Sequence, residues 1–250
     1  MSEAGLRIRF SDVGKAYRRR HLKSFLLKDI LRGLAREEDE TDKFWALRHV
    51  DFEVREGEMV AVLGQNGSGK STTLSLVAGA SHPTEGRVSV RGRVAPMLAL
   101  GVGFEPDMTA PENAYVNASL LGVSREELSE RLEVILRFAE LGDFVDTPVR
   151  HFSTGMTARL GFAVAMHVDA DILLVDEVLA VGDGAFQTKC LARIRELHAE
   201  CRTMMFVTHD LAAAREICTR GIWIRDGEIA IDAPIEECLT EYQAYLDAKG

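Results

Sequence analysis

Short runs of apolar residues alternate along this chain with longer segments of helical periodicity. The runs over residues 58–63, 171–175 and 203–207 are almost wholly apolar, as expected for strands that are buried on both faces. Shorter strand-like runs cover residues 87–90 and 221–224. Because helical segments separate these runs, the pattern predicts an α/β protein with a largely parallel sheet.

A polar stretch between residues 104 and 150 carries helical signals. Pro111 suits the first turn of a helix, and Ser124 followed by Glu127 has the spacing of a capping box. We therefore expect one domain with a helical subdomain over about 104–156. The core would be formed by residues 1–100 and 157–231, and a terminal helix would cover 234–248.

Residues 15–36 hold eight Lys and Arg residues and one acid, Asp29. Their apolar positions recur at spacings of three and four, which predicts a helix with one apolar face and a basic remainder. These positions are Leu22, Phe25, Leu26, Ile30 and Leu34. The acidic run 37–42 follows as a solvated turn, so an insert is expected over 18–43.

Composition narrows the class of protein. The chain has 250 residues, 46% of them hydrophobic, with 30 Lys and Arg against 39 Asp and Glu, a formal net charge of −9. The acidic balance argues against nucleic-acid binding. No apolar run approaches the ~18 residues that span a bilayer, and we expect no secretory signal because the first residues lack a basic segment followed by an apolar one. Cys190, Cys201, Cys218 and Cys238 form no Cys-x-x-Cys pair, so we expect free cytosolic thiols.

The segment after the run 58–63 matches the phosphate-binding pattern G-x-x-x-x-G-K-S/T (Walker A). Glycines at three positions let the backbone turn its N–H groups toward phosphate. The lysine would reach the β- and γ-phosphates, and the serine hydroxyl would ligate Mg²⁺. A glycine-rich turn with a surface lysine is the alternative, which a strand before and a helix after the loop disfavour. The predicted ATP site comprises Gly64, Gln65, Asn66, Gly67, Ser68, Gly69, Lys70, Ser71 and Thr72.

Two carboxylates, Asp176 and Glu177, close the apolar run 171–175 (Walker B). Parallel strands carry ligand sites at their C-terminal ends. Asp176 is expected to hold Mg²⁺, and Glu177 to polarise the water that attacks the γ-phosphate. Two solvated acids after a strand would be the simpler explanation, but the phosphate-binding loop favours catalysis.

The segment His151–Arg159, HFSTGMTAR, resembles the signature motif LSGGQ of ATP-binding-cassette (ABC) ATPases. Ser153 and Gly155, the positions that meet phosphate in that family, are retained. The resemblance implies that they cap the ATP bound by a second copy of the chain, so that two subunits close over two nucleotides. It also implies a P-loop NTPase fold, with a mixed sheet core, an N-terminal antiparallel β-subdomain and a helical subdomain.

Four further residues acquire roles from this resemblance, which extends from Leu6 to about Ile231. His209 matches the family's switch histidine, and Asp183 the loop between the two ATP sites. Tyr17 resembles the aromatic residue that stacks on adenine. Glu105 lies nearest the place where the family usually has a glutamine that contacts Mg²⁺ and the attacking water; a carboxylate can also face Mg²⁺, but it adds charge beside the triphosphate.

Residues 99–122, 138–156 and 171–190 resemble the polysaccharide-exporting branch of the family, which serves O-antigen, capsule or teichoic acid. The resemblance implies a homodimer held at the cytoplasmic face of the inner membrane by two copies of an integral-membrane permease. Lipid-linked polysaccharide would be the cargo. The basic insert would lie beside that cargo at the membrane, or else pack on the domain with a solvated basic face. No carbohydrate-binding domain is expected after the terminal helix.

Three other functions compete with this one. An importer or a drug or lipid exporter would use the same ATPase chemistry on another cargo. ABC proteins of DNA repair or of the ribosome need long coiled coils or two cassettes, which 250 residues do not accommodate. A regulatory module that holds ATP without turnover is disfavoured by Glu177.

Overall fold

The protein contains two β-sheets and seven α-helices within the residues that the computed structural model describes, which are 5–18, 43–97, 101, 103–176, 183–200 and 202–249. The antiparallel sheet has the order β2 (Lys43–Arg55), β1 (Leu6–Arg18), β4 (Glu85–Val90). The larger sheet has the order β5 (Val94–Met97), β6 (Ile172–Asp176), β7 (Thr203–Val207), β3 (Met59–Leu63), β8 (Arg220–Arg225), β9 (Glu228–Pro234). All its pairings are parallel except β8 with β9.

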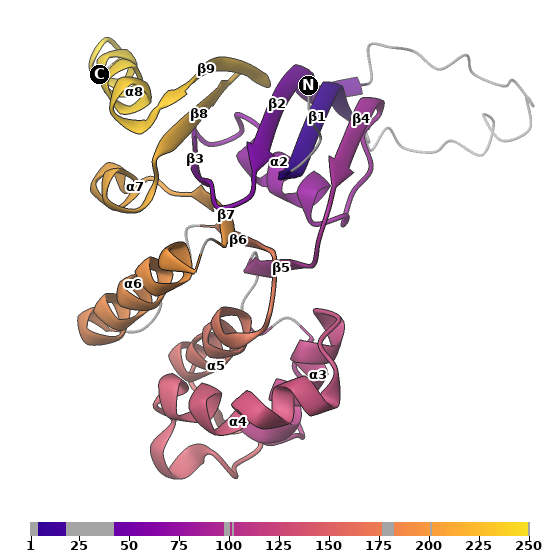
Figure 1. Ribbon diagram of the computed structural model, residues 1–250, viewed down its shortest axis with the longest axis vertical. Coiled ribbons are helices and arrows are strands. Elements are labelled where there is room, and N and C mark those ends of the chain that lie inside the picture. The colour runs from indigo at the N-terminus through magenta and orange to yellow at the C-terminus, as the bar shows by residue number, and fades with distance from the viewer. Residues whose placement is uncertain are drawn as a thin grey trace, which may run out of the picture.

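The helices are unevenly distributed over the molecule. Figure 1 shows α3, α4 and α5 gathered at the end opposite the antiparallel sheet, while α8 lies beside β8 and β9. The bounds are α2 (Lys70–Val77), α3 (Ala110–Leu120), α4 (Arg125–Ala139), α5 (Thr154–His167), α6 (Gly184–Ala199), α7 (Leu211–Ile217) and α8 (Ile235–Asp247). Short 3-10 turns cover Gly142–Phe144 and Val149–His151.

The central strands are apolar throughout because each separates two cores. Successive strand residues point to opposite faces. In β3, Val60 and Val62 join the cluster against the antiparallel sheet and α2. Ala61 and Leu63 join the cluster against α3, α5 and α6. The same alternation recurs in β6 and β7. This arrangement confirms the predicted mixed α/β fold with an antiparallel sheet at the N-terminal side.

Local capping signals define the helical end of the molecule. Ser124 accepts a hydrogen bond from the backbone N–H of Glu127, and the Glu127 carboxylate accepts one from the N–H of Ser124, so the predicted capping box is present. Thr109 and Glu112 form a second box at the start of α3, with Pro111 in its first turn.

The predicted basic helix began too early. Lys15 and Arg18 belong to β1, where they pair with β2, so a helix cannot include them. The rest of that prediction, and most of the insert 18–43, lies outside the described residues.

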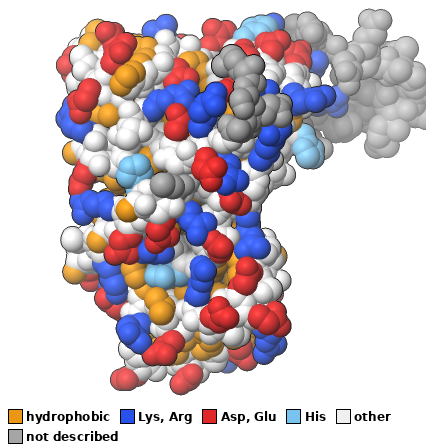
Figure 2. Space-filling view, viewed as in Figure 1, with side chains coloured by type: hydrophobic (Ala, Val, Ile, Leu, Met, Phe, Trp, Pro, Cys, Tyr) orange, Lys and Arg blue, Asp and Glu red, His pale blue; other side chains and the backbone are white. Residues whose placement is uncertain are grey.

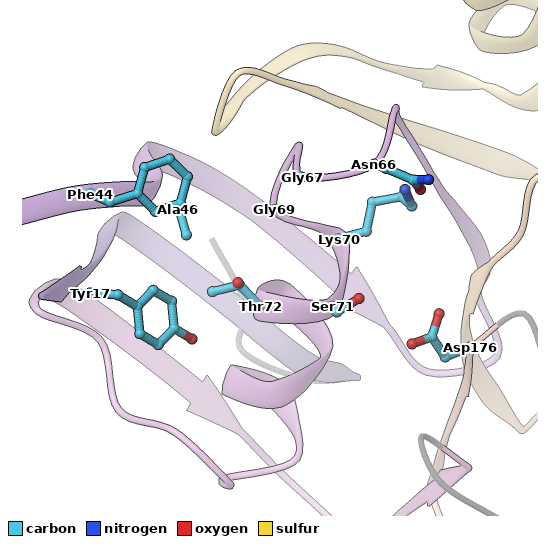
Figure 3. A pocket seen from close by; sticks show the side chains of 10 residues that line it. All are labelled: Tyr17, Phe44, Ala46, Asn66, Gly67, Gly69, Lys70, Ser71, Thr72 and Asp176. Carbon is cyan, nitrogen blue, oxygen red and sulfur yellow. The ribbon is translucent and has the colours of Figure 1, made fainter. Parts of the chain in front are cut away.

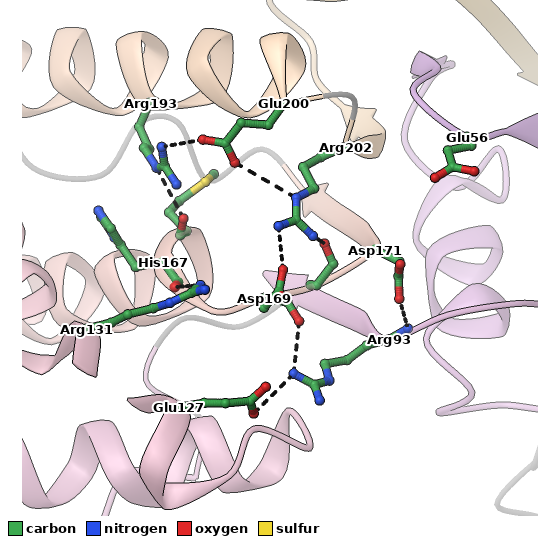
Figure 4. A network of polar contacts seen from close by, with 12 residues as sticks. Glu56, Arg93, Glu127, Arg131, His167, Asp169, Asp171, Arg193, Glu200 and Arg202 are labelled. Carbon is green, nitrogen blue, oxygen red and sulfur yellow. Dashed lines mark hydrogen bonds and ion pairs between the residues drawn. The ribbon is translucent and has the colours of Figure 1, made fainter. Parts of the chain in front are cut away.

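A network of polar contacts joins α4 to the strand β6 and the turn that leads into it (Figure 4). The backbone N–H of Arg93 donates to the Asp171 carboxylate over 2.8 Å, and its guanidinium donates to the carbonyl of Asp169 over 3.0 Å. The same guanidinium lies 3.6 Å from the Glu127 carboxylate. Arg93 therefore ties the start of α4 to the entry of a central strand.

The surface carries both signs of charge. On the face drawn in Figure 2, acidic and basic side chains are interspersed, with apolar side chains between them. Among the helices of the described residues, none has the length and apolar character needed to cross a membrane.

Candidate nucleotide-binding site

The loop between β3 and α2 has a backbone that requires glycine. Gly64 has φ +150°, and a Cβ there would lie 2.4 Å from the carbonyl oxygen of Ile224. Gly69, the N-cap of α2, has φ +114°, and its Cβ would lie 2.7 Å from the carbonyl oxygen of Ala46. Gly67 has φ +82° with no heavy atom within 4 Å of a Cβ position. The first two glycines allow close packing, and the third leaves open space above the loop.

Lys70 folds back over this loop. Its Nζ donates hydrogen bonds to the carbonyl oxygens of Gly64 at 2.7 Å and Gln65 at 3.1 Å, and the residue is only 6% exposed. The backbone of α2 starts at the same residue, so the positive end of the helix and the ammonium group lie together. Such a loop with N–H groups and a cation at a helix N-terminus is suited to binding phosphate.

The loop forms one wall of a cavity of about 520 Å³, within the size range of small-ligand sites. Figure 3 shows Tyr17 and Phe44 at one end of this cavity and Asp176 at the other, with Lys70 and Ser71 between them. The lining residues are Tyr17, Phe44, Ala46, Asn66, Gly67, Gly69, Lys70, Ser71, Thr72 and Asp176. The structure therefore brings together both ends of the predicted site.

Several predicted loop residues support the cavity from behind. Gly64, Gln65 and Ser68 do not line it. The Ser68 carbonyl accepts a hydrogen bond from the N–H of Gly227 in the β8–β9 turn. The Ser68 hydroxyl is buried, with no hydrogen-bond partner among the described atoms. The Gln65 side chain accepts a hydrogen bond from Lys249, which follows α8.

Asp176 and His209 differ in their position relative to the cavity. Asp176 ends β6 and reaches the cavity, whereas Glu177 lies outside the described residues. His209 is exposed in the turn between β7 and α7, beyond the residues that line the cavity. Asp210 beside it caps α7 by accepting from the N–H groups of Ala212 and Ala213.

Ser153, Gly155 and Asp183 lie away from the cavity. Ser153 is exposed and caps α5 by accepting a hydrogen bond from the N–H of Met156. Gly155 follows in the first turn of that helix, with the Ser153 hydroxyl as its nearest neighbour, 3.8 Å from a Cβ position. Asp183 caps α6, and the hydrogen bond from the Phe186 backbone N–H is the main cause that lowers the pKa of its carboxyl. Ser153 and Asp183, which cap the two helices, are thus both exposed among the described residues.

Glu105 is held by its backbone rather than by its side chain. Its N–H donates to the side-chain oxygen of Asn113 over 2.6 Å, and its carbonyl accepts from the Asn113 amide over 3.0 Å. The Glu105 side chain is exposed and does not line the cavity. Its expected contact with Mg²⁺ stays a prediction.

Three residues that shape the site or its surroundings were not predicted from the sequence. Phe44 and Ala46 line the cavity from β2, a strand that the apolar pattern did not reveal. Asn113, fully buried in α3, organises the loop that carries Glu105. A polar residue one turn into a predicted helix is a weak signal, and the position of Phe44 depends on a pairing between β1 and β2 that no local pattern encodes.

Comparisons with known proteins agree with this geometry. Residues 47–180 match the family model for ABC transporters. The chain is 45% identical over 238 residues to the O-antigen export system ATP-binding protein RfbB of Klebsiella pneumoniae, covering 94% of this chain and 97% of the relative. It is 36% identical over 242 residues to the teichoic acids export ATP-binding protein TagH of Listeria monocytogenes serotype 4b, covering 96% and 71%.

Among solved structures, the chain resembles a dimeric post-hydrolysis state of the ATP-binding cassette MJ0796 bound to ADP and Pi. The TM-score is 0.71 at 25% sequence identity, and the match covers 91% of this chain and 98% of that one. The family model, the extent of the sequence identity and the fold agree: the chain belongs to the ABC transporter family and is an ATP-binding ATPase of that family.

Proposed function

We propose that this chain is the ATP-hydrolysing subunit of an exporter that moves a lipid-linked polysaccharide of O-antigen, capsule or teichoic-acid type across the cytoplasmic membrane. The observation that supports this proposal most strongly is the 45% sequence identity, over nearly the whole length of both chains, to an O-antigen export ATP-binding protein. The cavity between the phosphate-binding loop and Asp176 supports the ATPase part. An importer or a drug or lipid exporter is the competing assignment.

The loop between β3 and α2 and the first residues of α2 would bind the phosphates. Lys70 would exchange its bonds to the loop carbonyls for the β- and γ-phosphates, a charge-assisted contact. Ser71 and Asp176 both offer oxygen to the same cavity, which suits Mg²⁺ when phosphate and water complete its shell. Bound there, Mg²⁺ would neutralise charge that develops on the phosphates.

The hydrolytic step rests on residues beyond the cavity. Glu177, directly after Asp176, would orient the attacking water and accept its proton. His209 follows the neighbouring strand β7 and would contact the γ-phosphate, while Glu105 would approach Mg²⁺. Tyr17, which lines the cavity itself, would stack on the adenine ring. These four roles are proposals that follow from the family motifs.

The functional unit would be two copies of this chain under two copies of a permease, at the cytoplasmic face of the membrane. The exposed start of α5, with Ser153 and Gly155, would cap the ATP bound by the second copy. Asp183 would link the two sites across the interface. The exposure of both helix starts supports an arrangement in which they meet another subunit.

A variant that binds ATP without hydrolysing it tests whether two copies of the chain form the ATPase. Glu177→Gln removes the base but keeps the size and polarity of the side chain, so it should bind MgATP, stop turnover and elute as a dimer in size-exclusion chromatography. Lys70→Ala in the same experiment should stay monomeric because it does not hold ATP. Normal hydrolysis by Glu177→Gln would remove Glu177 from the mechanism.

Copurification of the membrane partner and the location of the polysaccharide in cells test the proposed cargo. A tagged chain should bring down an integral-membrane permease, and cells that carry Lys70→Ala in place of the wild type should retain lipid-linked polysaccharide inside and lose it from the surface. Unchanged surface polysaccharide, or copurification with a solute-binding protein, would favour the competing assignment instead.

A further inference from the structure

Two aromatic rings are exposed at the end of the cavity farthest from Asp176 (Figure 3). Tyr17 in β1 is 44% exposed and Phe44 in β2 is 41% exposed. Leaving two large rings accessible to water is unfavourable, and adjacent exposed apolar groups in a hollow often mark a ligand site. Of the two, only Tyr17 matches a family position, that of the aromatic residue that stacks on adenine.

The strand register explains why both rings face the cavity. Tyr17 and Phe44 are direct partners across the antiparallel pair β1–β2, so their side chains project from the same face of the sheet. The adjacent pair, Ala16 with Trp45, projects from the opposite face. Trp45 accordingly packs against Gly14, where a Cβ would lie 2.9 Å from its ring. Phe44, and not its larger neighbour, therefore reaches the cavity.

A cation already occupies one side of the Tyr17 ring. The ammonium of Lys15 lies 5.1 Å from the ring centroid, and a hydrogen bond to the carbonyl of His82 holds it there. A planar ligand must therefore stack on the part of the Tyr17 ring that Lys15 leaves open. Phe44, the cross-strand partner of Tyr17, lies next to that part.

We propose that Phe44 is a second base-binding residue and forms with Tyr17 a two-ring platform for the nucleobase. This inference rests on the proposed nucleotide site and extends it to a residue on another strand. Aromatic rings bind bases by stacking and apolar contact, which every base can supply. The rings lie at one end of the cavity, Asp176 lies at the other and Lys70 lies between them (Figure 3), so a nucleotide with its base on the rings would extend its phosphates toward Lys70 and Asp176.

The platform also sets nucleotide selectivity. Among the described lining residues at this end, Phe44, Ala46, Tyr17 and Thr72 offer no charged group and no side-chain amide, and only the hydroxyls of Tyr17 and Thr72 could form hydrogen bonds with a base edge. Ring area should therefore contribute more to affinity than hydrogen bonds to the base edge. Adenine and guanine nucleotides should bind similarly, whereas cytosine nucleotides, with one ring, should bind more weakly.

Binding of MgADP and of Mg-tripolyphosphate, which lacks a base, separates this role from a structural one. By calorimetry on the full chain, Phe44→Ala and Phe44→Leu should weaken MgADP by about ten-fold and leave tripolyphosphate unchanged. Phe44→Trp should keep MgADP affinity within about three-fold because it restores a ring. Phe144→Ala, an equally exposed ring on the helical side, is the matched control and should change neither ligand.

Three results would overturn the proposal. They are wild-type MgADP affinity in Phe44→Ala and Phe44→Leu, an equal loss of tripolyphosphate binding in both variants, and a preference for MgADP over MgGDP beyond about fifty-fold. Wild-type chain that binds neither MgADP nor tripolyphosphate would instead refute the nucleotide site itself. In steady-state assays Phe44→Ala and Phe44→Leu should raise KM for ATP and keep kcat within about two-fold.

Discussion

Arg159 joins the helix that begins after Ser153 to the cap of the next helix, through a 2.9 Å hydrogen bond from its guanidinium to the Asp183 carboxylate. The Arg159 side chain is only 19% exposed and also lies 4.8 Å from the ring centroid of Phe186. The other oxygen of Asp183 accepts the N–H of Phe186. One carboxylate thus fixes the start of α6 relative to α5, the two helix starts that we assign to the subunit interface.

Asp183→Asn separates capping from charge. Asparagine retains the N-cap hydrogen bond but loses the ion pair with Arg159. We expect the urea midpoint of unfolding to change little, because exposed pairs contribute little stability. ATPase turnover should fall by about ten-fold because α5 and α6 are no longer held together.

Arg137→Gln is the matched control, since it breaks an exposed pair with Glu133 on α4, away from the interface. It should preserve turnover. Equal rates in Asp183→Asn, Arg137→Gln and wild type would show that the Arg159–Asp183 pair has no part in coupling.

Gly64 should be far less replaceable than another glycine of positive φ. Alanine at Gly64 would press a Cβ against the carbonyl of Ile224 and strain the backbone, so we expect a loss of about 2 kcal/mol or more in the free energy of unfolding. Gly79 has φ +70° with no heavy atom within 4 Å of a Cβ position, and alanine there should cost about 1 kcal/mol.

Urea unfolding and MgATP binding measure both variants. Gly64→Ala should also weaken MgATP, because the loop must move, whereas Gly79→Ala should bind normally. A smaller loss of stability in Gly64→Ala than in Gly79→Ala would contradict the close approach of β8 to the loop.

What the sequence could predict depended on how local each feature is. The phosphate-binding loop is encoded in consecutive residues, so Gly64, Lys70 and Ser71 were identifiable from spacing alone. The strands β3, β6 and β7 were identifiable because burial on both faces leaves an uninterrupted apolar run.

Features that depend on contacts between distant segments could not be predicted in this way. Phe44 enters the cavity only because β2 pairs with β1 in one register, which sets Phe44 opposite Tyr17. The bond between Arg159 and Asp183 joins residues on two helices, and the pair has no sequence spacing that marks it. Glu105 is a further case: its motif position suggests a metal contact, while its side chain is exposed and does not line the described cavity, so that contact stays a prediction.

Stability should decline in mild acid partly through His167. Burial lowers the pKa of this imidazole below its ordinary value near 6.5, an effect that the Ala163 carbonyl opposes and the charge of Arg193 reinforces. The unfolded chain therefore takes up the proton first. The contribution is complete above pH 6.5 and is lost as pH falls below 6.5 through the pKa of the folded state.

His167→Gln removes this titration. The decrease in the free energy of unfolding between pH 7.5 and 5.5, measured by urea denaturation, should be smaller than in the wild type. His198→Gln, an exposed histidine at the end of α6, should keep the wild-type dependence. The same slope in His167→Gln as in the wild type would show that His167 does not cause the acid sensitivity.

Glu105→Gln tests whether the negative charge near the proposed metal site is needed. An amide keeps the length and polarity of the side chain and removes one charge that would repel the triphosphate. We expect ATPase turnover equal to or above that of the wild type. A decrease beyond about 100-fold, about 2.7 kcal/mol of barrier, would show that the carboxylate itself is required.

Asn113 should be the most sensitive polar residue of α3. Its amide donates to the carbonyls of Glu105, Met108 and Thr109 at 3.0, 3.0 and 3.1 Å, while its oxygen accepts the N–H of Glu105 at 2.6 Å. The side chain is fully buried. Asn113→Ala leaves several of these groups without a partner and should lower the free energy of unfolding by about 2–3 kcal/mol.

Asn113→Asp distinguishes hydrogen bonding from packing. It keeps the shape of the side chain but turns a second carboxylate oxygen toward three carbonyls, so it should be at least as destabilising as alanine at neutral pH and recover stability as acid protonates it. Ser119→Ala, an exposed position later on α3, should change stability by less than about 1 kcal/mol. Because Asn113 positions the backbone of Glu105, both Asn113 variants should also lower turnover under conditions where they remain folded, if Glu105 acts on the nucleotide. Full turnover in folded Asn113→Ala would confine Asn113 to stability and separate the loop at Glu105 from hydrolysis.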